Sequence, residues 1–144
     1  MSLFKIVKED AHIKLTIFGI KIKFKNIFID RLKDCCCIAN LEEIKKQNTL
    51  FPHPIGIVIS PHTKLGKNCT IFQNVTIGSW KSKSPVIGDN VMIFANSVLF
   101  GDIMIGNNAV IGAGSVVNKS VPENAIVCGN PAKVIGMKEE GDKA

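Results

Sequence analysis

The sequence has no tyrosine, one tryptophan and three histidines, and it contains no long apolar run. A helix that crosses a membrane needs roughly 18 or more consecutive apolar residues, so we expect no membrane span. The first residues, MSLFKIVKEDAHIK, are charged and lack the apolar core of a secretory signal. These absences predict a cytoplasmic protein.

The spacing of the five cysteines does not fit the common zinc and disulfide patterns. Three of them are consecutive, from Cys35 to Cys37, and the others are Cys69 and Cys128. The chain therefore has no CxxC pair and an odd cysteine count. We expect reduced thiols, as is usual in the cytoplasm, and no metal site.

Basic residues exceed acidic ones, but they do not form a nucleic-acid platform. The formal net charge is +6, and the excess lies mostly in KLTIFGIKIKFKN, residues 14–26. Proteins that bind single strands combine a basic groove with stacking aromatic residues, and we find no such run, so we expect no nucleic acid partner. The stretch alternates apolar residues with lysine, which predicts a hairpin or an edge strand whose lysines discourage further pairing. A positive surface also suits a phosphorylated cofactor.

The main feature of the sequence is an aliphatic residue at every sixth position. Turn-forming triplets such as GKN, GDN and GNN lie between these positions. A small or branched residue stands four positions after each aliphatic residue. That residue stands two before the next aliphatic one, so both point to the same side of a strand. The two runs are Ile59, Leu65, Ile71 and Ile77, then Ile87, Ile93, Leu99, Ile105, Ile111 and Val117.

Each unit therefore predicts one very short strand followed by a corner. Glycine, asparagine and aspartate tolerate the backbone angles of a sharp corner, and stacking provides a core that one short strand lacks. Hexapeptide repeats of this kind build a β-helix, in which three units make one triangular coil. A coincidental alternation in a β-sandwich is the alternative, and the phase kept along both runs argues against it.

Stacked coils predict three inward columns, and an insertion between the two runs. The insertion lies in GSWKSKSPV, residues 78–86, and should bulge out at one corner. The columns are Ile59, Ile77, Leu99 and Val117; Leu65, Ile87 and Ile105; and Ile71, Ile93 and Ile111.

These patterns predict an all-β fold in three parts. Residues 51–136 form the β-helix, residues 1–50 form a short β/α extension, and residues 137–144 form a loose charged tail. Ile38, Ile44 and Leu50 also stand six apart, but LEEIKKQ suits a helix as well as a strand. Residues 30–50 therefore stay open between the two.

Three segments resemble the hexapeptide-repeat acyltransferases. They are FPHPIGIVIS from Phe51, IFQNVTIG from Ile71 and IGAGSVVNKSVPENAIVCGNPAKVIG from Ile111. The likeness runs from Phe51 to Gly136 and is strongest to serine O-acetyltransferases and their relatives in surface-polysaccharide synthesis. It implies a left-handed parallel β-helix, although the general crossover rule favours the right hand. It also implies acetyl-CoA as the acyl donor, and a homotrimer with its active site between neighbouring subunits.

The chain departs from the serine enzymes where they hold the amino acid. Pro52 stands where they typically carry an aspartate, Ser84 and Pro85 stand at a second active-site histidine, and residues 1–50 replace a large helical domain. We infer a changed acceptor, with a sugar hydroxyl of a bacterial cell-surface glycan as the main hypothesis. Serine O-acetylation in cysteine biosynthesis and a non-catalytic repeat scaffold are the alternatives.

His53 is the candidate general base. Pro52 and Pro54 restrict the backbone on both sides of it, and imidazole can take a proton from an alcohol near neutral pH. Without the resemblance, a stiff corner with a solvated ring explains the pattern equally well. His62 stands at a turn and is expected to be solvated, and His12 lies outside the repeat. Their spacing does not fit the zinc cluster of a γ-class carbonic anhydrase.

The resemblance also assigns the ligand-binding residues. Small side chains would leave room for an extended pantetheine arm, although Phe94, where the family often has glycine, would narrow the groove. Lysines could meet the phosphates of coenzyme A, with plain solvation as the alternative. The acceptor residues are Asn74 and Ser84, and the acyl-CoA residues are Gly78, Ser79, Ala95, Ala113, Lys119 and Lys133.

Overall fold

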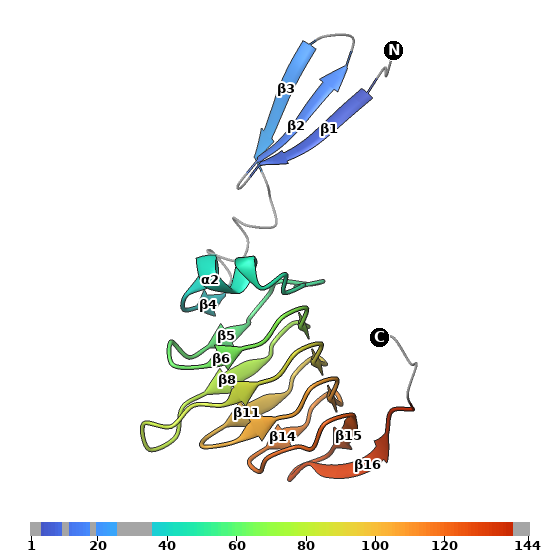
Figure 1. Cartoon of the computed structure of the whole chain (residues 1–144). Coiled ribbons are helices and arrows are strands. Elements are labelled where there is room, and N and C mark those ends of the chain that lie inside the picture. Colours follow the sequence, from blue (N-terminus) through green and yellow to red (C-terminus); the bar gives the residue numbers. More distant parts are fainter. Residues whose placement is uncertain (1–3, 10–11, 18–19, 26–35, 140–144) are drawn as a thin grey trace.

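A computed structural model gives the fold and describes residues 4–9, 12–17, 20–25 and 36–139. Near the N-terminus, β1 (Phe4–Glu9), β2 (His12–Ile17) and β3 (Ile20–Lys25) form an antiparallel sheet in the order β1-β2-β3 (Figure 1). β2 and β3 pair antiparallel in the region for which a hairpin or an edge strand was predicted. Their register pairs Ile17 with Ile20.

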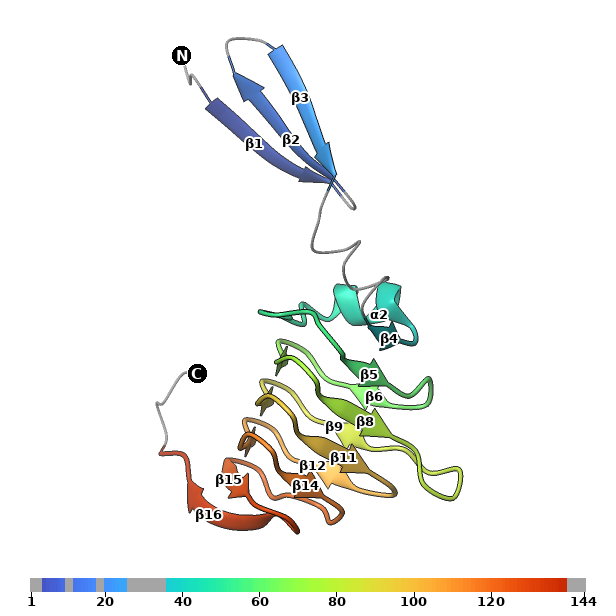
Figure 2. The ribbon, with the colours of Figure 1, turned by 180° about the vertical axis from the view of Figure 1, so that it is seen from behind.

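From Cys37 onward the chain forms a parallel β-helix with three sheets along its length (Figure 2). The first sheet holds β4 (Cys37–Ile38), β5 (Val58–Ile59), β8 (Thr76–Gly78), β11 (Val98–Phe100) and β14 (Val116–Val117). The second holds β7 (Thr70–Ile71), β10 (Met92–Ile93), β13 (Val110–Ile111), β15 (Ala125–Cys128) and β16 (Lys133–Met137). The third holds β6 (Lys64–Leu65), β9 (Val86–Ile87) and β12 (Met104–Ile105).

The strand register confirms all three predicted columns. Ile77 pairs with both Ile59 and Leu99, and Ile87 and Ile93 occupy the corresponding places in the other two sheets. Every residue of the columns is buried. The small or branched residues between them are buried except for the half-buried Thr63, and the hydroxyl groups of the two serines among them find backbone acceptors: Ser97 Oγ donates to Phe94 O at 2.7 Å and Ser115 Oγ to Gly112 O at 2.6 Å.

Asparagines hold two of the three corners of the coil. They adopt positive φ, which asparagine tolerates better than most residues. Their side chains also bond from coil to coil: Asn108 Nδ2 donates to Asn124 Oδ1 at 3.0 Å, and Asn74 Nδ2 donates to Asn96 Oδ1 at 3.2 Å. The longer ladder joins Asn48, Asn68, Asn90, Asn108 and Asn124.

The predicted insertion projects from the corner after β8, as the yellow-green loop of Figure 1 shows. The backbones of Trp80 and Lys83 exchange hydrogen bonds of 2.8 and 2.9 Å. Lys81 and Ser82 have φ of 48° and 61°, so the tip is a tight two-residue hairpin turn. The stack continues across the insertion because Ile77 and Ile87 both keep their columns.

The stack extends beyond the boundaries predicted at residues 51 and 137. β4 pairs in parallel with β5, so a first coil precedes residue 51. In that coil α2 (Leu41–Lys46) occurs in place of a strand; its acidic first turn and basic last turn suit the helix dipole, and it buries Ile44. At the other end Met137 belongs to β16, and Lys138 N donates to Asn124 O at 2.7 Å.

Candidate functional site

His53 lies in the loop that leads from the first coil into β5. Ile55 N donates to His53 O at 2.8 Å, and Asn74 N donates to Ile55 O at 2.8 Å. Pro54 is buried, whereas the imidazole of His53 is exposed. The loop therefore fixes the backbone of His53 to the next coil and leaves the ring facing outward.

Three other predicted residues share the corner of His53, which lies between the second and first sheets. Asn74, Ala95 and Ala113 occupy it in successive coils, each one just before the first sheet resumes. The amide of Asn74 is engaged in the ladder with Asn96. Phe94 stacks on the ring of Phe72 in the preceding coil, with centroids 5.0 Å apart, so these two rings lie along the stack.

Gly78, Ser79 and Ser84 lie at a different corner, where the insertion leaves the first sheet. Ser79 Oγ is 2.6 Å from Ser84 Oγ and 2.6 Å from Ser60 Oγ, so three hydroxyl groups form one hydrogen-bonded cluster. Sequence reasoning missed Ser60, whose only signal is its place just after an inward residue. Along β8, Asn74 and Ser79 are about 15 Å apart at the usual rise of a strand. Within one chain, these serines are therefore not next to His53.

The two predicted phosphate-binding lysines lie near the C-terminal end of the stack. Lys119 follows β14, Lys133 begins β16, and both are exposed. Ala132 N donates to Val116 O at 2.8 Å, which ties the segment before Lys133 to the first sheet. Neither lysine forms an ion pair within the described residues.

The remaining predictions concern thiols, metals and membranes. Burial raises the pKa of the Cys69 thiol to about 11, while a backbone hydrogen bond from Val91 lowers it and the charge of Asp89 raises it slightly further. In the described part of the chain, no three His, Cys, Asp or Glu side chains are placed to hold a metal ion. None of the helices described there has the length and apolar character to cross a membrane. His62 is exposed, and the side chain of His12 lies outside the description.

Comparisons with known proteins agree with this architecture. Residues 84–119 match the family described as Bacterial transferase hexapeptide (six repeats). The β-helix is therefore a domain whose hexapeptide repeats match, within residues 84–119, those of bacterial transferases. This domain is similar to the serine acetyltransferase of Staphylococcus epidermidis, with 45% identity over 93 residues that cover 62% of the chain and 43% of the relative. Serine acetyltransferase 4 of Arabidopsis thaliana is 38% identical over 97 residues, or 65% of the chain and 27% of that protein.

Solved structures place the hexapeptide-repeat domain in the same fold. A serine acetyltransferase from Neisseria gonorrhoeae superposes with a TM-score of 0.61 and 41% identity, over 64% of this chain and 37% of that one. Another, solved in complex with CoA, gives a TM-score of 0.58 and 37% identity, over 60% and 37%. The left-handed β-helix and the resemblance to serine O-acetyltransferases are thereby confirmed. The chain spans less than half the length of these relatives.

Proposed function

We propose that the chain is an acetyl-CoA-dependent O-acetyltransferase in which His53 is the general base. The observation that carries this proposal is the similarity of the hexapeptide-repeat domain to serine acetyltransferases, one of which was solved with CoA. The anchored backbone and exposed ring of His53 support it, because a general base needs a fixed position and access to substrate.

The reaction is a direct transfer. The imidazole of His53 takes the proton of an acceptor hydroxyl as its oxygen attacks the thioester carbonyl. The tetrahedral intermediate collapses, the carbon–sulfur bond breaks, and the thiolate of CoA takes the proton from the imidazolium. The products are an O-acetyl ester and free CoA, and His53 returns to its neutral form.

Serine is the acceptor that the comparisons favour, because the named relatives are serine acetyltransferases. A sugar hydroxyl of a cell-surface glycan, the main hypothesis from the sequence, is the second candidate. It is supported by Pro52 and Ser84, which stand where the serine enzymes hold their amino acid. Ser84 is joined to Ser79 and Ser60, so this corner offers neutral hydroxyl groups in place of a histidine.

A homotrimer would complete the site. The His53 corner and the Ser79 corner lie at opposite edges of the first sheet, so one chain does not bring them together. The outward positions of this sheet carry Val58, Thr76, Val98 and Val116, which suit contact with a neighbouring subunit better than charged side chains would. We place acyl-CoA in the groove between the His53 corner of one subunit and the Ser79 corner of the next, with Lys119 and Lys133 available to its phosphates.

Release of CoA thiol from acetyl-CoA tests the proposal. The purified chain is assayed with L-serine, with a panel of free and nucleotide-linked sugars, and with buffer alone. We expect acceptor-dependent release with serine, and release with a sugar would instead identify the second candidate. Two results from a folded protein would contradict the transferase assignment: no thiol release with any of the acceptors, or the same release in buffer alone. The first result would favour a scaffold role.

A further inference from the structure

The N-terminal sheet has two faces of opposite character. Residues alternate between the faces of a strand, and the register places Phe4 opposite Ile17 and Leu15 opposite both Ile6 and Ile22. One face therefore carries positions 4, 6 and 8 of β1, 13, 15 and 17 of β2, and 20, 22 and 24 of β3; all of them are Ile, Leu or Phe except Lys8, which lies on the edge strand. The other carries Lys at positions 5, 14, 21, 23 and 25.

A three-stranded sheet of this kind needs a partner. Sheets of this size are stable in water when their apolar face packs on another element. The basic face suits solvent, since lysine is strongly hydrated. What packs against the apolar face must therefore be apolar and within reach of the chain.

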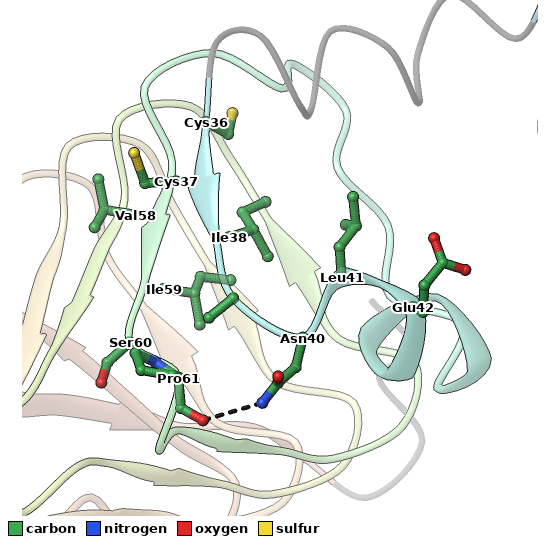
Figure 3. Close-up of a pocket in the computed structure, with 11 residues that line it drawn as sticks. Cys36, Cys37, Ile38, Asn40, Leu41, Glu42, Val58, Ile59, Ser60 and Pro61 are labelled. Carbon is green, nitrogen blue, oxygen red and sulfur yellow. Dashed lines mark hydrogen bonds between the residues drawn. The ribbon is translucent and has the colours of Figure 1, made fainter.

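The N-terminal end of the β-helix offers an apolar surface of that kind. A cavity of about 770 Å³ lies there, and the apolar side chains around it include Ile38, Leu41 and Ile59. Figure 3 shows Ile38 and Leu41 close to each other between β4 and the start of α2. Ile38 is the first residue in the column that contains Ile59. Ile59 is 3% exposed, whereas Ile38 is only half-buried. At the opposite end of the stack Val117 and Val127 are 1% and 2% exposed, so the uncovered end of the core is the N-terminal one.

We propose that the apolar face of β1, β2 and β3 packs on this end of the β-helix of the same chain and closes the cavity. Terminal coils of repeat proteins need such a cap, because no further coil covers them. This inference does not depend on the transferase activity.

The tether favours the same chain over a second copy. Residues 26–36 join β3 to β4, the first strand of the stack, and an extended chain of that length spans at most about 40 Å. A short link of this kind holds the sheet near the cavity at an effective concentration of roughly millimolar, well above the protein concentration of an ordinary assay. Docking within the chain should therefore win over docking between chains.

Photo-crosslinking in the full chain tests the contact. A benzoylphenylalanine is introduced at Leu15, on the apolar face, and in a matched control at Thr16, the next residue on the opposite face. We expect crosslinks from position 15 to peptides that contain Ile38, Leu41 or Val58, and none from position 16. When ¹⁴N- and ¹⁵N-labelled chains are unfolded, mixed in equal amounts and refolded together, so that any oligomer contains both labels, the crosslinked peptides should carry a single label. Mixed labels would show docking on a second copy, and the absence of these crosslinks from position 15 would show that the sheet packs elsewhere; either result overturns the proposal.

Hydrogen exchange adds a measurement on the β-helix itself. The amides of Cys37 and Ala39 donate to Ile57 O and Ile59 O, which hold the first coil on the second. Leu15→Asp should speed exchange of these amides and of α2 by about tenfold or more, because the cap is lost, whereas Thr16→Asp should leave them near wild type. Equal exchange in the two variants would overturn the proposal. The exchange rates remain informative even if Leu15→Asp unfolds the sheet, because the measured amides lie in the β-helix.

Discussion

At the scale of single residues, the candidate base is positioned by its backbone. Prolines flank His53, its carbonyl accepts from Ile55, and Ile55 in turn is bonded to Asn74 of the next coil. No side-chain partner of the imidazole was found within the described residues. The loop thus limits the motion of the ring without burying it, and in the proposed trimer the neighbouring subunit would provide the cover.

Replacement of His53 should separate chemistry from folding. His53→Ala should lower the rate of acetyl transfer by about 10² to 10⁴, because the acceptor loses its base. The exposed ring contributes little packing, so the thermal unfolding curve should stay close to wild type. Thiol release and circular dichroism give the two readouts. His62→Ala, another exposed histidine, is the control, and equal loss of activity in both variants would contradict the assignment.

The raised pKa of Cys69 predicts an unreactive thiol. At pH 8, N-ethylmaleimide should modify the exposed Cys37 rapidly and Cys69 only after unfolding in urea, as mass spectrometry of the peptides would show. The same shift sets a pH dependence. Below pH 9 the thiol is neutral in both states, but between pH 9 and about 11 the unfolded state loses its proton first, so stability falls as pH rises. Cys69→Ala should remove that part of the loss.

At the scale of elements, the corners are set by asparagine and the strands by the columns. The longer ladder runs along the whole stack, from the first coil to the turn before β15. Each member occupies a left-handed backbone position, and its amide links one coil to the next. Asparagine at a corner therefore serves both the turn and the stacking of the coils.

Asn108 gives a test of that dual role. Asn108→Ala should lower the free energy of unfolding by about 2 kcal/mol, from the left-handed conformation and the lost ladder bonds together. Asn108→Gly removes the same bonds but adopts the φ of 59° freely, so it should cost about half as much. Urea unfolding of the two variants and the wild type measures the difference. A glycine variant less stable than the alanine variant would contradict this explanation.

Much of the β-helix could be predicted because its period is local and strict. The six-residue spacing predicts every column from Ile59 to Val117, and the longer spacing from Ile77 to Ile87 locates the insertion. The first coil could not be settled in this way, because LEEIKKQ satisfies both a strand and a helix. Its helix is decided by the burial of Ile44 against the stack, a tertiary contact.

The site was harder to predict than the fold for a related reason. The resemblance assigns Asn74, Ala95 and Gly78 to one binding region. The coil places Asn74 and Ala95 at the His53 corner but Gly78 at the next corner, where the insertion begins. Asn74, assigned to the acceptor, is also a ladder residue with its amide bonded to Asn96. The sequence of one chain does not determine which corners of neighbouring subunits come together. Which residues form the complete site is therefore a prediction that depends on the proposed trimer.

At the scale of the whole molecule, that prediction becomes a question of which chains share a site. In the proposed trimer, every site takes His53 from one subunit and the Ser79 corner from the next. Such a cyclic, head-to-tail interface uses two different surfaces of each chain. Two variants that are inactive for different reasons can then restore each other.

Co-expression of His53→Ala with Ser79→Trp tests this arrangement. The first removes the base, and the second fills the other side of the groove, so each alone should be inactive as a trimer of about three times the 15.7 kDa chain mass. In mixed trimers some sites combine an intact His53 with an intact Ser79, and random assembly in equal amounts should recover about a quarter of wild-type activity. Thiol release on the co-purified trimer, with sedimentation to confirm its mass, gives the measurement. A site built within one chain would leave every subunit damaged, and mixing would then restore nothing.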